Sequence, residues 1–130
     1  HPAMRPIGPK LNAAEIRALD DYCASKGVEL VPNQNSFGHL GAWFTRPQYK
    51  HLAECPAGVK LEKPKLNCGP TALCATSPES IRFLSGLYDE FLPCFRSKRV
   101  NVGCDEVWDI LDPRGKSAAK VKELGEEGRQ

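Results

Sequence analysis

Two short apolar segments constrain the fold of this chain more than any other feature of its sequence. Residues 28–31 (Val-Glu-Leu-Val) and 99–103 (Arg-Val-Asn-Val-Gly) are rich in β-branched side chains, which favour strands. A helical pattern precedes each segment and polar residues follow it. Because parallel strands need a crossover connection, usually a helix, this order is typical of a parallel α/β sheet. The sequence therefore predicts the α/β class, with two strands over these residues.

Capping signals delimit the two main helices. Asn12 is a suitable N-cap with Glu15 three residues later, and Gly27 is the expected end of that helix. Residues 76–79 (Thr-Ser-Pro-Glu) open the second helix, and Pro93 closes it. The apolar stripe expected on the second helix consists of Ile81, Leu84, Leu87, Tyr88 and Phe91.

The other segments carry weaker patterns. Residues 1–11 are predicted to form a loop, and short helices are expected around Trp43 and near Tyr49–Ala53. Residues 55–75 contain three prolines, two glycines and three cysteines, which predicts an irregular excursion. Residues 116–130 are predicted to form a charged, weakly amphipathic helix or a frayed tail.

Composition excludes several classes of protein. The chain has 130 residues, 18 Lys and Arg against 16 Asp and Glu, and 41% hydrophobic residues, which describes one globular domain at most. A protein of nucleic acid or membrane surfaces would need a basic stripe, so neither partner is expected. No apolar run approaches the roughly 18 residues of a membrane span, and no signal-peptide pattern is present, which favours a cytoplasmic location. Because the chain begins with His1 instead of Met, we expect it to be processed or cut from something longer.

Six cysteines are many for this length, but none of them forms the C-x₂-C pattern of a zinc or redox site. An even number permits disulfides, with 15 possible pairings. Cys23, Cys94 and Cys104 lie on or beside apolar elements, where a free cysteine behaves as a small hydrophobic residue. We therefore favour free buried thiols, with a disulfide framework and a metal site as the alternatives.

The polar residues after the second apolar segment include an adjacent carboxylate pair, Asp105 and Glu106. In parallel α/β folds, active sites lie at the carboxyl ends of strands. If the backbone turns there, both carboxylates can enter one pocket, and close carboxylates in apolar surroundings favour one protonated and one ionised form. Glycoside hydrolysis needs that arrangement. The alternative is a solvated helix start, where carboxylates are also favoured.

The loop after the first apolar segment is densely polar. His39 could relay a proton to a carboxylate or hydrogen-bond a sugar hydroxyl, or it could be structural. Asn33 and Asn35 could bind sugar hydroxyls or satisfy the loop backbone. Trp108 could stack on a sugar ring or pack against the core.

Two ordered motifs together resemble the catalytic barrel of glycoside hydrolase family 20, the β-N-acetylhexosaminidases. They are V-P-N-Q-N-S-F-G-H at residues 31–39 and N-V-G-C-D-E at residues 101–106. The family carries P-E-x-D-x-P-G-H after one strand and H-x-G-G-D-E after the next. The resemblance covers roughly residues 12–117 and is closest to a divergent bacterial branch. It implies that residues 1–130 are a single partial catalytic domain: a portion of a (β/α)₈ TIM barrel with about two βα units, resembling strands 3 and 4.

The resemblance also implies a chemistry, which is retaining, substrate-assisted hydrolysis of amino-sugar glycosides. The 2-acetamido carbonyl of the sugar attacks its own anomeric carbon, so no enzyme nucleophile is needed. Glu106 matches the general acid/base, Asp105 matches the carboxylate that orients the acetamide, and His39 matches the histidine of the proton network behind the acid. We expect a carbohydrate partner, and neither a cofactor nor a metal.

Departures from the family pattern affect the same motifs. Asn33 and Asn35 replace the Glu and Asp of the first motif, and in the second motif Asn101 replaces His and Cys104 replaces Gly. A complete barrel needs roughly 250 residues. The isolated chain is therefore expected to be inactive. The rival predictions are a non-catalytic carbohydrate-binding or interaction remnant of the same fold, and a small disulfide-stapled domain.

Overall fold

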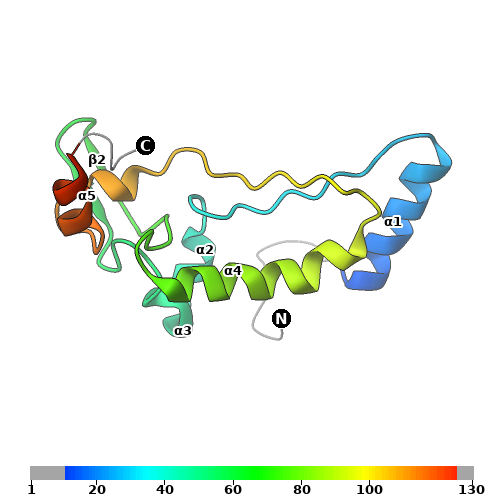
Figure 1. Cartoon of the computed structure of the whole chain (residues 1–130), viewed down its shortest axis with the longest axis horizontal. Coiled ribbons are helices and arrows are strands. Elements are labelled where there is room, and N and C mark those ends of the chain that lie inside the picture. The colour runs from blue at the N-terminus through cyan, green and yellow to red at the C-terminus, as the bar shows by residue number, and fades with distance from the viewer. Residues whose placement is uncertain (1–10, 126–130) are drawn as a thin grey trace. The chain divides into compact units, whose positions relative to one another are not determined.

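The computed structural model describes residues 11–125, and they fall into two compact units (Figure 1). The first unit contains the described residues up to Gln34 together with Arg82–Val102. The second contains Asn35–Ile81 and the described residues from Gly103 onward. The predicted loop at residues 1–11 lies almost entirely outside the described residues. No helix among the described residues is long and apolar enough to cross a membrane.

Helix α1 (Ala13–Ser25) belongs to the first unit and begins where its capping signals predict. The Asn12 side chain accepts hydrogen bonds from the backbone N–H groups of Ala14 and Glu15, at 2.9 and 3.0 Å. The Glu15 carboxylate in turn accepts from the backbone N–H of Asn12 at 2.7 Å. This reciprocal capping box confirms the predicted start of the helix.

Helix α4 (Pro78–Phe91) confirms the second predicted helix. A 3₁₀ turn, η1 (Leu92–Cys94), follows it, because Pro93 cannot continue the hydrogen bonding of an α-helix. The predicted apolar stripe is only partly correct. Leu87 is buried, but Ile81 is 66% exposed. The buried residue of the first helical turn is instead Ser80, whose hydroxyl donates to Cys74 O at 2.8 Å.

The two predicted strands are not observed. Residues 28–33 and 99–102 of the first unit are extended and run parallel (Figure 1), but they are joined only by an isolated bridge between Asn33 and Asn101. The Asn101 N–H donates to Pro32 O at 2.9 Å, and the Gln34 N–H donates to Asn101 O at 3.0 Å. A regular ladder needs further bonds and a covered face. Instead the valines of these segments are 38–55% exposed, namely Val28, Val31, Val100 and Val102.

The core of the described chain lies mainly in the second unit. Short helices α2 (Gly41–Phe44) and α3 (Pro47–Lys50) confirm the two predicted helices, although the second begins earlier than predicted because Pro47 opens it. The buried apolar side chains of this unit include Leu40, Phe44, Leu52, Ala53, Val59, Leu61, Ala72 and Leu73.

An antiparallel hairpin occupies the region predicted to be irregular. Strand β1 (Val59–Leu61) pairs with strand β2 (Leu66–Cys68), so that prediction is wrong for these residues. The prolines and glycines of residues 55–75 lie outside the two strands, and β1 alternates buried, exposed and buried residues. Three-residue strands are too short to produce a clear sequence pattern.

Two elements complete the second unit. The 3₁₀ turn η2 (Trp108–Leu111) follows the predicted carboxylate pair, and helix α5 (Ala118–Leu124) lies within the predicted C-terminal helix. The turn contacts strand β1. Residues 126–130 lie outside the described part of the chain.

Candidate active site

A histidine and two carboxylates from two loops meet in the second unit. His39 Nε2 lies 3.3 Å from Asp105 Oδ2 and 3.7 Å from Glu106 Oε2. One ligand atom from each residue lies within 4.8 Å of the other two. The structure thus brings together the three residues that the sequence proposes as catalytic. We refer to them as the His39–Asp105–Glu106 cluster.

Two glycines allow the loops of the cluster to approach each other. A Cβ atom on Gly38 would lie 2.7 Å from the backbone oxygen of Asp105, and one on Gly103 would collide with the side-chain oxygen of Asn35. The Ser36 N–H donates across the same junction to Gly103 O at 3.3 Å. Any side chain at either glycine would push the two loops apart, so the geometry of the cluster depends on both.

Two members of the cluster adopt an unusual backbone conformation. His39 has φ +56° and Glu106 has φ +50°, in the left-handed region that side chains other than glycine rarely occupy. Such conformations cost roughly 1–3 kcal/mol each and are found preferentially at functional sites. Their occurrence at two of the three clustered residues supports the hypothesis that the cluster is functional.

The cluster is open to solvent. The His39 side chain is 42% exposed, and the side chains of Asp105 and Glu106 are 68% and 64% exposed. The expected apolar pocket around the two carboxylates is therefore not formed by the described residues. Water screens the attraction between a protonated imidazole and these carboxylates, so their pairing in this chain is weak.

The remaining predicted site residues lie in different places. Asn35 packs against Gly103. Trp108 is 40% exposed at the start of η2, and its backbone N–H donates to Glu106 O at 3.1 Å. Asn33 belongs to the first unit, where its backbone forms the bridge to Asn101. Asn35 and Trp108 therefore lie beside the loops that carry the cluster, whereas Asn33 belongs to the other unit.

Sequence reasoning missed a buried carboxylate, Asp109, three residues after Glu106. Asp109 is 0% exposed, and its carboxylate accepts hydrogen bonds from the backbone N–H groups of Thr71 and Ala72 and from the Thr71 hydroxyl. A signal was present: Asp109 interrupts the apolar run Val-Trp-Asp-Ile-Leu, and a charged residue there is buried only when it is paired.

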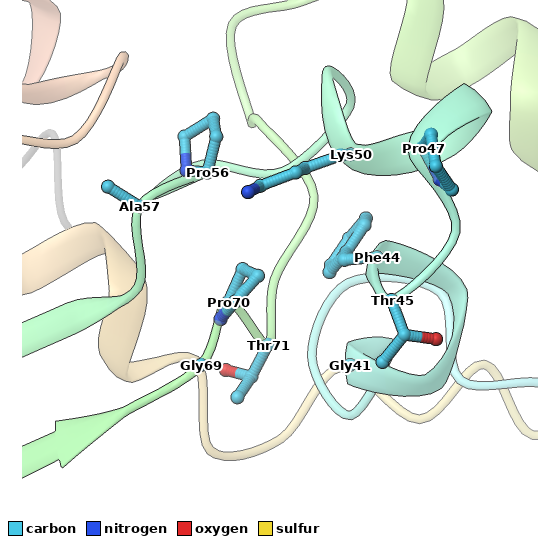
Figure 2. Close-up of a pocket in the computed structure, with 10 residues that line it drawn as sticks. All are labelled: Gly41, Phe44, Thr45, Pro47, Lys50, Pro56, Ala57, Gly69, Pro70 and Thr71. Atoms are coloured by element: carbon cyan, nitrogen blue, oxygen red, sulfur yellow. The ribbon is translucent and has the colours of Figure 1, made fainter.

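A separate hollow of about 710 Å³ lies in the same unit (Figure 2). Figure 2 shows the Lys50 side chain extending across it, with Phe44, Pro56 and Pro70 around it. None of the predicted site residues lines this hollow. Its walls are mainly apolar with a single cationic side chain, and nothing in the sequence pattern pointed to it.

The chemistry available to the cluster follows from its donor atoms. A carboxyl group can give a proton to a leaving oxygen and take one from water, while a neighbouring imidazole can exchange a proton with it. An imidazole nitrogen and two carboxylate oxygens this close together are also ligands that a divalent cation accepts. The exposed position of all three side chains leaves them accessible to a ligand.

Comparison with known proteins identifies relatives for most of the chain. The family model described as glycosyl hydrolase family 20, catalytic domain, matches residues 5–126. A beta-hexosaminidase of Akkermansia muciniphila is 30% identical over 98 residues, covering 71% of this chain and 18% of that protein. A lacto-N-biosidase of Bifidobacterium bifidum is 32% identical over 81 residues, covering 62% of this chain and 6% of that protein.

A solved structure shares the fold of the chain. The crystal structure of a Flavobacterium johnsoniae chitobiase superposes with a TM-score of 0.68 at 24% identity, covering 93% of this chain and 18% of that one. The chain thus spans less than a fifth of the length of each of these three proteins.

Proposed function

The chain belongs to glycosyl hydrolase family 20, and on that premise we propose that it is part of a catalytic domain that removes terminal N-acetylhexosamine residues by retaining, substrate-assisted hydrolysis. The observation that carries the proposal is the His39–Asp105–Glu106 cluster, in which three groups from two separate loops lie within 4.8 Å of one another. The strained backbone of His39 and Glu106 adds support.

Each residue of the cluster has a proposed role. Glu106 protonates the leaving oxygen as the bond of that oxygen to the anomeric carbon breaks, while the acetamido oxygen of the sugar bonds to the same carbon. Water then gives a proton to the Glu106 carboxylate and adds to that carbon as the bond to the acetamido oxygen breaks, which restores the acid and retains the configuration. Asp105 accepts a hydrogen bond from the acetamide N–H and stabilises the positive charge that develops beside it. His39, within 4 Å of both carboxylates, moves protons between the acid and solvent.

The proposal also states which part of a barrel this chain forms. Residues 28–31 and 99–103 correspond to the third and fourth strands of a (β/α)₈ barrel, and residues 1–130 form a single partial domain. Exposed valines in these extended segments support this, because a barrel strand is covered on both faces. The chain alone is proposed to be inactive, since residues 11–125 form no apolar walls around the cluster and its carboxylates are 64–68% exposed.

The same exposure favours a second candidate function, that of a non-catalytic carbohydrate-binding remnant. Asn33 and Asn35 stand where the family carries Glu and Asp, and amides bind sugar hydroxyls without a net charge. This function predicts weak binding of an amino sugar that is unchanged in Glu106→Gln.

The test is hydrolysis of an aryl N-acetyl-β-glucosaminide, with its galacto-epimer and the plain glucoside as comparisons. It uses the chain by itself and the full gene product that contains it. We expect no turnover by the chain alone, and turnover by the full product that falls by at least about a hundredfold in Glu106→Gln. Glu123→Gln is the matched control, because Glu123 is an exposed glutamate of α5 paired with Lys120.

Each result decides between the candidates. Equal turnover by Glu106→Gln and the unsubstituted product would rule out the role of Glu106. Absence of turnover by the full product, together with amino-sugar binding that survives Glu106→Gln, would favour the carbohydrate-binding remnant. Hydrolysis by the monomeric chain alone would contradict its proposed inactivity.

A further inference from the structure

A buried carboxylate lies three residues after Glu106. Asp109 occupies η2 and is 0% exposed. Its Oδ1 accepts from Thr71 N at 2.9 Å and from Ala72 N at 3.0 Å, and its Oδ2 accepts from the Thr71 hydroxyl. A carboxylate is buried this completely only when donors satisfy it, and three do so here. The loop that carries Asp105 and Glu106 is thereby attached to residues 71–72.

Residues 71–73 also hold the loop that carries His39. The Leu40 N–H donates to Thr71 O at 2.8 Å, and the Leu73 N–H donates to Phe37 O at 3.0 Å. These two bonds lie on either side of His39 in the sequence. The position of the imidazole therefore depends on where residues 71–73 are held.

The contacts form a closed ring. It runs from Glu106 along the chain to Asp109, across the hydrogen bonds to Thr71, through the Thr71–Leu40 bond to His39, and back to Glu106 over 3.7 Å. We propose that Asp109 is a positioning residue, which sets the separation of His39 from Asp105 and Glu106 by anchoring both loops to residues 71–73. Only the catalytic consequence of this role rests on the proposed function.

Asp112 provides a matched control, because it is also a buried aspartate of the same unit and lies three residues further on. Its carboxylate accepts from Lys60 N at 2.8 Å and from the Arg114 side chain. It therefore attaches the same segment to strand β1 and to Arg114, and not to the residues that hold the His39 loop. Loss of Asp112 removes a part-buried ionic contact with Arg114 and leaves the ring intact.

The experiment compares Asp109→Ala, Asp109→Asn and Asp112→Ala in the full chain by NMR. One reporter is the contact between the two loops, where a Cβ on Gly38 would lie 3.5 Å from a Val107 methyl carbon, so a Gly38 Hα–Val107 methyl NOE is expected. The other reporter is the set of His39 ring resonances. Core methyl resonances of Leu40 and Leu73 show whether each variant remains folded.

We expect Asp109→Ala to lose the NOE and to shift the His39 ring resonances, while Asp112→Ala changes neither. Asp109→Asn should restore both, because its amide oxygen accepts the two backbone N–H groups and its NH₂ group donates to the Thr71 hydroxyl. An Asp109→Ala chain that remains folded with an unchanged NOE and unchanged His39 resonances would overturn the proposal.

If Asp109→Ala does not fold, the variant Thr71→Val tests the positioning role instead. This variant removes one of the three hydrogen bonds and keeps the shape of the side chain. A measurable shift of the His39 ring resonances supports the positioning role, and resonances identical to those of the unsubstituted chain overturn it.

Hydrolysis by the full gene product separates this inference from the proposed function. There we expect Asp109→Ala to lower kcat by about tenfold or more with little change in KM, and Asp109→Asn to recover most of the loss. If the NMR differences occur but no variant or parent hydrolyses any substrate, the proposed function fails and the positioning role stands. If the parent is active and Asp109→Ala retains its kcat, its NOE and its His39 resonances, the positioning role fails alone.

Discussion

Gly103 shows how a single residue controls the candidate site. Its backbone has φ +49°, and a Cβ at this position would collide with the Asn35 side-chain oxygen. The same loop carries Asp105 and Glu106, so the absence of a side chain is a condition for the approach to His39. The motif N-V-G-C-D-E contains this glycine, but the sequence does not show which atoms a side chain at this position would contact.

We expect Gly103→Ala to destabilise the chain by about 2–4 kcal/mol, because it combines an unfavourable φ with a steric collision. Gly27→Ala is the matched control, since Gly27 has φ +71° and no atom within 4 Å of its would-be Cβ. It should cost only about 1–2 kcal/mol, the cost of the left-handed conformation alone. Urea unfolding of both variants checks the difference. A Gly27→Ala chain as unstable as Gly103→Ala would contradict the collision.

At the scale of secondary-structure elements, side-chain bonds from buried carboxylates attach η2 to its neighbours. Asp112, directly after η2, accepts from the backbone N–H of Lys60 in β1 and from Arg114. These hydrogen bonds hold the pKa of Asp112 well below its ordinary value despite its burial, and the bond from the Arg114 side chain has the largest effect. The attachment therefore depends on the ionised carboxylate.

This attachment predicts a pH dependence. Because the folded-state pKa of Asp112 is depressed, the stabilisation is fully present above its unfolded value of about 4 and is lost as pH falls toward the folded value. Asp112→Asn should lower the free energy of unfolding by about 1–3 kcal/mol at pH 7. The difference between variant and parent should shrink below about pH 4, as measured by urea unfolding at pH 7, 4 and 3. A difference that is constant over this range would contradict the prediction.

At the scale of the whole molecule, apolar burial is concentrated in the second unit. Among the buried apolar side chains of the described residues, only Leu87 and Cys94 belong to the first unit. Asp20 is also buried there and pairs with Arg96 at 3.0 Å. The exposed valines of residues 28–31 and 99–102 follow from the same lack of covering elements.

The six cysteines differ in their exposure to solvent. All six are free thiols in the structure, with Cys55, Cys74 and Cys94 buried and Cys104 exposed. The exposure of Cys104 contradicts its predicted role as a small hydrophobic residue at the end of a strand, because that strand is not formed. Burial, aided by the carboxylates of Asp112, Asp109 and Glu54, raises the pKa of the Cys55 thiol to about 12.

We expect iodoacetamide at pH 8 to alkylate Cys104 in the native chain at least about a hundred times faster than Cys55, since only the thiolate reacts. Peptide mass spectrometry of a time course measures both rates. In denaturant without reductant, all six thiols should react. Fewer than six would indicate a disulfide and favour the rival stapled domain, and equal native rates for the two cysteines would contradict the burial of Cys55.

The helices were predictable because their signals are local. Asn12 with Glu15, and Pro93 after an amphipathic run, act within one turn of the backbone and need no distant partner. The family was predictable for a similar reason, since two short motifs at a given separation carry it. The candidate residues His39, Asp105 and Glu106 were named from those motifs. The strands predicted at residues 28–31 and 99–103 are not formed, although an isolated parallel bridge joins Asn33 and Asn101.

Other features depend on contacts between residues distant in the chain, and only the tertiary structure decided them. Val28 and Val100 have strand-forming side chains, but a ladder forms only where neighbouring elements cover it, and none of the described elements does. The closeness of the His39 and Glu106 loops needed Gly38 and Gly103 at one junction. The burial of Asp109 needed donors from Thr71 and Ala72, which lie 38 and 37 residues away. Local sequence specifies backbone preference and chemistry, whereas burial and the spacing of the site follow from which distant segments meet.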